Sequence, residues 1–288
     1  MSVSRPNHEK FKRAAWYRDE PPQQIDPTLI KLLEERGISS TKIRDHVKDI
    51  HHRAFEVHPW PCVAGYSFLK TLMSKMPIFQ TVLPRLQHEN ATILDVGCAL
   101  GQDIRVLISK NVPSRNIYAL DFTAGFFDIG YQLFNDRPGA DKGMEEVNFV
   151  LRNFVSDPPQ EWFGKMDFVF AGAFFHVFNY DDQLAASRNA ARMLKNQNGS
   201  LIFGYQLGRD PAGHSQIAAM GTSDNEMMWR HDEKSFRKMW NDIGAETGVQ
   251  YDVQVTITDQ GIDDFRKRDD CMRLMTFVVE MVEPASNL

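Results

Sequence analysis

The sequence predicts an α/β protein in which helices pack on both faces of a parallel sheet. The stretch ILDVGCALGQD, residues 93–103, is typical of a short buried strand, a tight glycine turn and the start of a helix. From residue 91 onward, strand-like and helix-like segments alternate, and such a repeat predicts a parallel sheet. The residues before it have helical patterns and predict a helical cap.

The predicted elements follow from short apolar runs for strands and from helical spacing of apolar residues for helices. Strands are expected at 92–96, 116–121, 148–151, 167–171 and 200–204, with helices near 102–110, 124–135 and 181–195 between them. Asp232 is expected to cap a helix that ends near Gly244. Two further strands, 249–258 and 272–282, are separated by the charged segment 259–270.

Residues 1–88 are predicted to form an arm and the helical cap, and residues 89–288 the main domain. The first 28 residues are polar and rich in proline, which predicts an extended arm with a short helix near 8–17. Helices are expected over 27–37, 42–57 and 68–73, whereas Pro59 and Pro61 argue against helix around Trp60. The segment 209–231 has no clean period and is expected to be a substrate lid.

Composition narrows the classes of function. The chain has 288 residues, 42% of them hydrophobic, and a net charge of −5, which gives no electrostatic reason to bind nucleic acid or an anionic membrane. No segment predicts a signal peptide or stable membrane insertion, so a cytoplasmic protein is expected. The C-terminal Ser286-Asn287-Leu288 differs by one residue from a peroxisomal address, and an accidental match is the favoured interpretation.

The sequence predicts no metal site. The three cysteines lie far apart and fit neither a disulfide framework nor a zinc site. The expected helix 42–57 carries several acids and histidines, but His46 and His52 diverge by about 240° around a helix. His51 and His52 are adjacent and also diverge, so a solvated polar face is favoured.

The turn after the first strand indicates the class of ligand. Gly97 and Gly101 form a G-x-x-x-G turn preceded by Asp95, whereas a dinucleotide fold would show G-x-G-x-x-G. Asp121 ends the second predicted strand, where a carboxylate can accept hydrogen bonds from ribose hydroxyls. That acid alone does not separate NAD from S-adenosylmethionine, but the D-x-G-x-x-x-G turn after a helical cap favours S-adenosylmethionine.

Over residues 91–282 the chain resembles the class I S-adenosylmethionine-dependent methyltransferases. The matching stretches are 95–101, 119–121, 166–176 and 194–202. The resemblance implies a doubly wound, seven-stranded, mostly parallel Rossmann-like sheet with an N-terminal helical cap. It also implies S-adenosylmethionine as the cofactor and S-adenosylhomocysteine as its product.

The same resemblance implies which residues hold the cofactor. Gly97 would face its methionine end, Asp95 its amino group and Asp121 its ribose hydroxyls. Phe122 would lie against the adenine. Where the family usually shows Gly-Asp after the third strand, this chain has Arg152-Asn153, and the Asn153 amide can still accept from the adenine amino group. Further contacts are expected at Cys98, Gly101, Phe154 and Ala171.

A narrower resemblance is to fungal methyltransferases of polyketide and meroterpenoid pathways. It is carried by HPWPC at 58–62, GQDIR at 101–105, GYQLF at 130–134, and FHVF at 175–178 with Gln183. Known members of that set esterify the carboxylate of a farnesylated aromatic polyketide before terpene cyclisation. The resemblance therefore implies an O-methyltransferase of fungal secondary metabolism that forms a methyl ester on a hydrophobic aromatic acid.

The chemistry depends on the acceptor. A carboxylic acid with a pKa near ~4 is ionised at neutral pH, whereas a phenol near ~10 is not and requires a base. His176, at the mouth of the sheet, is either a general base for a phenol, a hydrogen-bond donor to a carboxylate, or a packing residue. Trp60 is either a wall over the ligand or an anchor for the cap. Residues expected near the acceptor are Trp60, Phe175, Phe178, Met227, Met228 and Trp229, with Arg230 or His231 beside an acid group.

Three functions therefore stay open: an ester-forming methyltransferase, a phenol O-methyltransferase with His176 as general base, and a regulatory protein that binds S-adenosylmethionine without turnover. The expected partner is a hydrophobic small molecule, and a nucleic-acid methyltransferase is disfavoured by the acidic charge. The proline-rich arm fits either a homodimer contact or a disordered segment.

Overall fold

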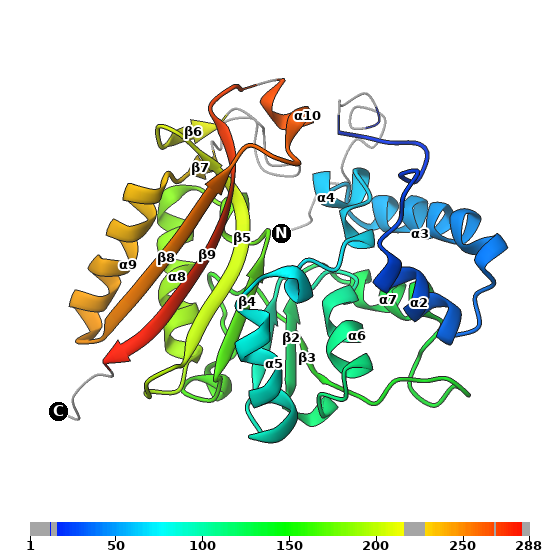
Figure 1. Ribbon diagram of the computed structural model, residues 1–288, viewed down its shortest axis with the longest axis horizontal. Helices are drawn as coiled ribbons and strands as arrows, with labels where there is room; N and C mark the ends of the chain where they lie inside the picture. Colours follow the sequence, from blue (N-terminus) through cyan, green and yellow to red (C-terminus); the bar gives the residue numbers. More distant parts are fainter. Residues whose placement is uncertain (1–11, 13–15, 216–227, 268, 284–288) are drawn as a thin grey trace.

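The computed structural model describes residue 12 and residues 16–215, 228–267 and 269–283. One seven-stranded sheet, in the order β3-β2-β1-β4-β5-β9-β8, runs through the molecule with helices on both faces (Figure 1). Strands β1 to β5 are parallel, and β9 is antiparallel to both of its neighbours. The predicted Rossmann-like class I methyltransferase fold is confirmed.

The strands agree with the predicted segments, with one difference in length. Strand β5 continues past the expected end at 204 to Arg209, because β9 pairs with it along its whole length, from Leu201↔Glu280 to Arg209↔Met272. The bounds are β1 Ile93–Val96, β2 Ile117–Asp121, β3 Asn148–Leu151, β4 Phe168–Gly172, β5 Leu201–Arg209, β8 Gln250–Thr258 and β9 Met272–Glu283, with a small hairpin of β6 Gly213–Ser215 and β7 Met228–Arg230.

Alternate residues of β1 face opposite helical layers. Leu94 and Val96 belong to the core shared with α8 and α9, whereas Ile93 belongs to the core shared with α5, α6 and α7. This double burial explains why the strand is a continuous apolar run interrupted only by Asp95. The helices are α5 Phe79–His88, α6 Gln102–Ser109, α7 Phe126–Phe134, α8 Tyr180–Met193 and α9 Glu233–Thr247, with the short α10 Asp263–Arg266 before β9.

Two helices differ from the sequence prediction. Helix α9 continues past Gly244, which packs so closely on the following turn that a Cβ would lie 2.5 Å from the Val249 carbonyl oxygen. The helix ends instead at Gly248, which has the left-handed conformation typical of a C-cap. Helix α5 was not predicted, and it contains Pro84 while burying Phe79, Val82 and Leu86.

The N-terminal region is helical but more broken than expected. It contains α2 Pro27–Glu35, α3 Ile43–Val57 and α4 Pro61–Ala64, with short 3₁₀ turns at Ser40–Lys42, Ser67–Leu69 and Met73–Lys75. Trp60 itself lies outside a helix, as predicted, but a helix begins directly after it at Pro61, because proline suits the first helical position, where no amide hydrogen bond is needed. The expected helix at 68–73 is wrong as well, since 3₁₀ turns replace it. The short helix expected near 8–17 falls largely outside the described residues.

His51 corrects the expected solvated face of α3. Its side chain is fully buried and stacks on the Tyr66 ring at 4.0 Å, with Nε2 3.3 Å from the Ala64 carbonyl oxygen. Burial lowers the pKa of His51 to about 4, so the ring is neutral at physiological pH. No group of three potential metal ligands was found in the described part of the chain.

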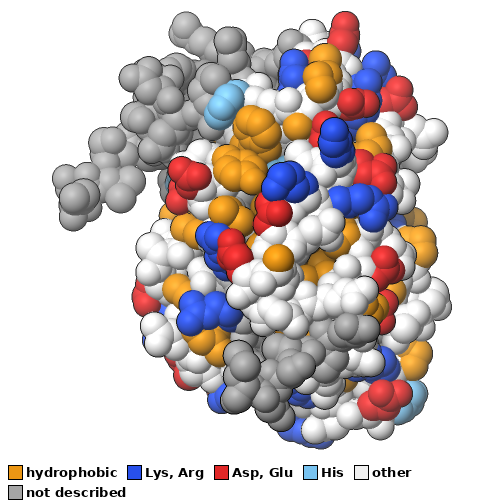
Figure 2. All heavy atoms as spheres, turned by 90° about the vertical axis from the view of Figure 1, so that its left-hand side faces the viewer, with side chains coloured by type: hydrophobic (Ala, Val, Ile, Leu, Met, Phe, Trp, Pro, Cys, Tyr) orange, Lys and Arg blue, Asp and Glu red, His pale blue; other side chains and the backbone are white. Residues whose placement is uncertain are grey.

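The N-terminal helices pack on the sheet domain near the carboxyl ends of β1 and β2. Leu33 and Val47 share one hydrophobic core with Leu100, Phe126 and Phe134 of the sheet domain. In Figure 1 this cap lies on the right, in blue, opposite α9. Figure 2 shows acidic and basic side chains interspersed over the face on the α9 side. Among the described helices, none combines the length and apolar character needed to cross a bilayer.

Candidate functional site

The glycine turn lies between β1 and α6 at the carboxyl edge of the sheet. Gly97 and Gly101 have φ of +72° and +71°, a region that side-chain-bearing residues rarely adopt. The Gly97 amide donates to the Leu120 carbonyl at 2.8 Å, which fixes the turn to β2. A Cβ on Gly97 would lie 2.6 Å from Cδ2 of Phe174, so a ligand that approaches this glycine meets the Phe174 ring.

Three buried carboxylates surround this turn. Asp121 accepts from the Ala99 amide at 2.9 Å and from the Thr123 amide at 2.7 Å. Asp103 accepts from the Met73 amide at 3.2 Å, and burial raises its pKa to about 7. Asp95 has no hydrogen-bonding or cationic partner among the described side chains, and burial, with Asp103 and Asp121 nearby, raises its pKa well above the ordinary value. The site is therefore electronegative and suits a cationic ligand.

Aromatic side chains of the cap and of β2 meet beside these acids. Trp60 stacks on His58 at 4.4 Å and lies edge-on to Phe122 at 6.4 Å. The Phe122 side chain follows Asp121 directly and is 55% exposed, the largest exposure among the large apolar residues that the structure describes. Cys62 is a free cysteine, and desolvation of its thiol by burial, with Asp121 nearby, raises the pKa of that thiol to about 11. The cap thus places Trp60 and Cys62 next to the second-strand acid.

His176 follows β4 in a 3₁₀ turn, Phe175–Val177. Its Nδ1 is buried and has no hydrogen-bond partner in the described part of the chain. Burial, with the nearby Arg230 guanidinium, holds the pKa of His176 well below its usual range. The imidazole is therefore neutral at physiological pH.

Arg230 lies beside His176 and is only 2% exposed. Its Nη1 donates to the His176 carbonyl, and its Nη2 lies 3.0 Å from the Met228 sulfur. No carboxylate pairs with it in the described residues, and burial lowers its pKa to about 9, so that it stays charged at neutral pH. Leaving a cation buried without a counter-charge is costly.

Gln183 of α8 fixes the position of β7 beside His176. Its amide donates to the carbonyls of Phe178, at 3.0 Å, and Trp229, at 2.7 Å. The Trp229 amide also donates to the Phe178 carbonyl at 3.1 Å. The FHVF segment and Gln183 therefore hold β7, and with it Arg230, in position. His231, by contrast, is engaged by the Ser235 hydroxyl at 2.9 Å.

The structure brings together most of the predicted residues but moves several away from the expected contact. Phe175 is fully buried against Phe277 and Phe174, so its expected place in the acceptor pocket is wrong. Ala171 lies inside β4 with no exposed surface, and Cys98 is buried with its amide bonded to the Leu120 carbonyl. Both side chains pack in the interior, and the cofactor contacts expected at these two positions stay predictions.

The loop after β3 also differs from the expectation. The Asn153 side-chain oxygen accepts from the amides of Val155 and Ser156, at 2.9 and 3.1 Å, so it already caps its own turn. Phe154 is 3% exposed and lies edge-on to Phe174 at 5.7 Å, which makes it a support for that ring. Met227 lies outside the described residues.

Three residues near the site were missed by the sequence interpretation. Asp103 and Phe174 lie within motifs that were recognised, but their side-chain directions depend on tertiary packing. Tyr205 lies on β5 opposite Gly172, and burial, with Asp103, Cys62 and Asp95 nearby, raises its pKa above the ordinary range. Its position at the carboxyl end of a predicted strand was the one signal available in the sequence.

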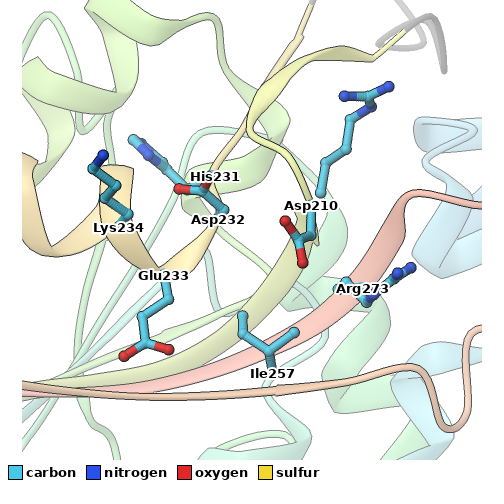
Figure 3. Close-up of a pocket in the computed structure, with 8 residues that line it drawn as sticks. Asp210, His231, Asp232, Glu233, Lys234, Ile257 and Arg273 are labelled. Carbon is cyan, nitrogen blue, oxygen red and sulfur yellow. The ribbon is translucent and has the colours of Figure 1, made fainter.

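A separate hollow of about 320 Å³ lies at the far end of β5 (Figure 3). Of the residues described so far around the glycine turn and around Arg230, only His231 lines it. Its carboxylates and cations balance, and several are already engaged: Arg209 pairs with Asp269 at 3.0 Å, and Asp232 caps α9. The lining residues are Arg209, Asp210, His231, Asp232, Glu233, Lys234, Ile257 and Arg273. This mixture of opposite charges does not indicate a particular class of ligand or reaction.

Comparisons with known proteins show the family of the chain. Residues 16–69 match the family model of the meroterpenoid methyltransferase N-terminal domain, and residues 93–197 match the methyltransferase domain. The O-methyltransferase phiE of a fungal species (strain ATCC 74256) is 33% identical over 246 residues, which cover 85% of this chain and 80% of phiE. The O-methyltransferase atr3 of Stereocaulon alpinum is 32% identical, over 85% of this chain and 70% of atr3.

A further relative is the asnovolin E/chermesin D methyltransferase nvfJ of Aspergillus novofumigatus, 30% identical over 82% of this chain and 85% of nvfJ. Two solved structures share the fold. Phosphoethanolamine N-methyltransferase 1 of Haemonchus contortus, solved with S-adenosylhomocysteine, has a TM-score of 0.53 and 14% identity over 87% of this chain and 51% of that one. The N-terminal domain of EvdMO1, with S-adenosylhomocysteine bound, has a TM-score of 0.50 and 15% identity over 82% and 97%. The chain therefore belongs to the fungal meroterpenoid-type O-methyltransferases, a class I family that uses S-adenosylmethionine as methyl donor.

Proposed function

We propose that this enzyme forms a methyl ester on the carboxylate of a hydrophobic aromatic acid, with a farnesylated polyketide acid as the substrate class. The observation that carries the proposal is Arg230, a buried guanidinium with no carboxylate partner in the described part of the chain. An acceptor carboxylate supplies the missing charge, and the planar guanidinium favours a two-point contact with it.

The state of His176 supports a carboxylate over a phenol. A general base works best when its pKa lies near the operating pH, and the pKa of His176 is held well below 6.5 by burial and by Arg230. Such a weak base is poorly matched to a phenol with a pKa near ~10, whereas a carboxylate near ~4 needs no base. In the proposal, the neutral imidazole donates a hydrogen bond to the acceptor instead.

The donor site is proposed to use the electronegative turn. Asp95 would receive the cationic amino group at the methionine end of the cofactor, which supplies the counter-charge that this carboxylate lacks in the described residues. Asp121 has free acceptor capacity for the ribose hydroxyls, and the exposed Phe122 would cover the adenine, with Trp60 beside it. When bound, S-adenosylmethionine supplies a methyl group already activated by the sulfonium, so the protein mainly aligns the acceptor and excludes water.

In the proposal, the segment 209–231 aligns the acceptor. It forms a lid over the methyltransferase domain, residues 89–208, and over the N-terminal cap. Its described part is the β6–β7 hairpin, which carries Met228, Trp229 and Arg230. Trp229 is edge-on to Tyr180 at 5.5 Å, so the hairpin offers an aromatic surface next to the cation. That combination suits an apolar molecule with one acid group.

Substitution of His176 by Ala tests the proposal with two matched acceptors, a prenylated aromatic acid and its methyl ester with the phenol free. We expect the wild type to methylate the acid alone. The H176A variant should lose roughly 3- to 10-fold in kcat/KM, a loss that stays flat from pH 6 to 9 because no proton is transferred. Turnover of the free phenol, with a loss in H176A that rising pH restores, would instead establish the phenol O-methyltransferase.

A further inference from the structure

A fully buried ion pair lies directly behind the glycine turn. Arg105 of α6 and Asp136, two residues after α7, are both 0% exposed. Their contact is two-pronged, with Nε to Oδ2 at 3.1 Å and Nη2 to Oδ1 at 3.0 Å. The third guanidinium nitrogen, Nη1, donates to the carbonyls of Leu100 at 3.1 Å and Gly101 at 3.2 Å. One rigid group therefore joins α6, the end of α7 and the last two peptides of the turn.

The surroundings are shaped to this guanidinium. It lies over the rings of Phe127, Tyr131 and Phe134, with centroid distances of 5.6, 5.2 and 4.9 Å. Gly130 of α7 lets the glycine turn pack against this helix, because a Cβ there would lie 2.2 Å from the Leu100 carbonyl oxygen. The GQDIR and GYQLF segments thus meet at one place, behind the cofactor turn.

Stability alone gives a weak reason for this arrangement. A buried ion pair is often no more stabilising than apolar residues of the same volume, because both charges lose their hydration. A guanidinium held by four hydrogen bonds does, however, fix the orientation of its partners accurately. Those partners include the peptide carbonyls at the end of the glycine turn.

The turn is held from its other side by a residue of the donor site. The Ala99 amide donates to the Asp121 carboxylate at 2.9 Å, and the Gly101 amide donates to the Cys98 carbonyl at 2.8 Å. The turn therefore lies between Asp121 in front and Arg105 behind. A shift of its carbonyls would move Gly97 and Asp121 relative to each other.

We infer that Arg105 and Asp136 are positioning residues that set the glycine turn for the methyl donor without touching it. The pair acts through the backbone of Leu100 and Gly101, so its loss weakens donor binding more than it unfolds the protein. This role is independent of the acceptor and holds for any methyl acceptor of the enzyme.

The test measures binding of S-adenosylhomocysteine by calorimetry, together with thermal unfolding, in R105K and in the double variant R105M/D136L. In R105K, lysine keeps the positive charge but cannot make the two-pronged contact with Asp136. The double variant removes both charges and replaces them with apolar side chains. The matched control is R85K, an Arg-to-Lys change at the opposite edge of the sheet, where Arg85 donates to the Gly199 carbonyl at 2.7 Å.

We expect the dissociation constant for S-adenosylhomocysteine to rise roughly 10- to 30-fold in R105K and in the double variant, with Tm lowered by about 5 °C or less. Hydrogen exchange of residues 97–102 should also accelerate in both. The R85K variant should keep wild-type affinity. Affinity within twofold of wild type in R105K, equal loss in R85K, or failure of both Arg105 variants to fold would overturn the inference and make the pair a scaffold element.

Discussion

Two buried aspartates, one in β1 and one directly before the neighbouring strand β4, have opposite surroundings. Asp167 lies at the amino edge, just before β4, and is bound by Lys195 at 2.6 Å, Gln197 at 3.0 Å and the Thr92 amide at 2.8 Å. Asp95 lies near the carboxyl edge, in β1, with no such partner in the described part of the chain and with other acids nearby. Burial is the same, but only Asp167 has its charge satisfied by the fold itself.

The two most buried arginines of the described residues show the same contrast. Arg105 has a carboxylate and two carbonyls for partners, whereas Arg230 has carbonyls and a sulfur but no carboxylate in the described residues. A protein rarely buries an unpaired charge, because the lost hydration is not recovered. In the proposal, the unpaired members Asp95 and Arg230 are where donor and acceptor bind. Of the paired members, Asp167 stabilises the sheet and Arg105 positions the glycine turn.

The largest effect is expected from Arg230→Met. Removing the guanidinium should lower kcat/KM for the acid acceptor by roughly 10²- to 10³-fold, because the acceptor carboxylate would be buried unpaired. R230K should recover part of the loss. Binding of S-adenosylhomocysteine, measured by calorimetry, should stay within about twofold of wild type. A loss of several kcal/mol in the free energy of unfolding would instead show that the protein itself pairs with Arg230.

The two aspartates can be compared directly by measuring both ligand affinity and stability in D95N and in D167N. D95N should weaken binding of S-adenosylhomocysteine roughly 10- to 100-fold without lowering stability, since it removes a charge that is unpaired in the free enzyme. D167N should do the reverse and lower the free energy of unfolding by about 2–4 kcal/mol while affinity is kept. Urea unfolding and calorimetry on both variants check this, and the same pattern in both variants would refute the distinction.

A smaller effect is expected from Asp103→Asn, measured as stability against pH. The pKa of Asp103 is about 7 in the folded chain and 3.8 ordinarily, so between these values the folded state holds a proton that the unfolded state has lost. Stability therefore falls as pH rises through this window. D103N should remove that fall and be more stable than wild type at pH 8 by on the order of 2 kcal/mol. Parallel stability curves for the two proteins would contradict the assignment.

Local patterns in the sequence were sufficient for the fold and the donor turn. Positions such as Gly97 and Asp121 are fixed by chain spacing within one strand–turn–helix unit, so the sequence carries them directly. Contacts between distant segments were out of reach: His176 meets Arg230 across 54 residues, and Arg105 meets Asp136 across 31. The misplacement of Phe175 and His51 has the same origin, because only the packed structure shows which face of a short turn or helix is buried.

The position of the transferred methyl group tests the central claim most directly. The enzyme would be given S-adenosylmethionine with a ¹³C-labelled methyl group and a prenylated aromatic acid that carries both a carboxylate and a phenol. The account predicts a product whose label is released as methanol by mild alkaline hydrolysis, as a methyl ester requires. A label that stays on the aromatic product after hydrolysis would place the methyl group on the phenol and contradict the role given to Arg230.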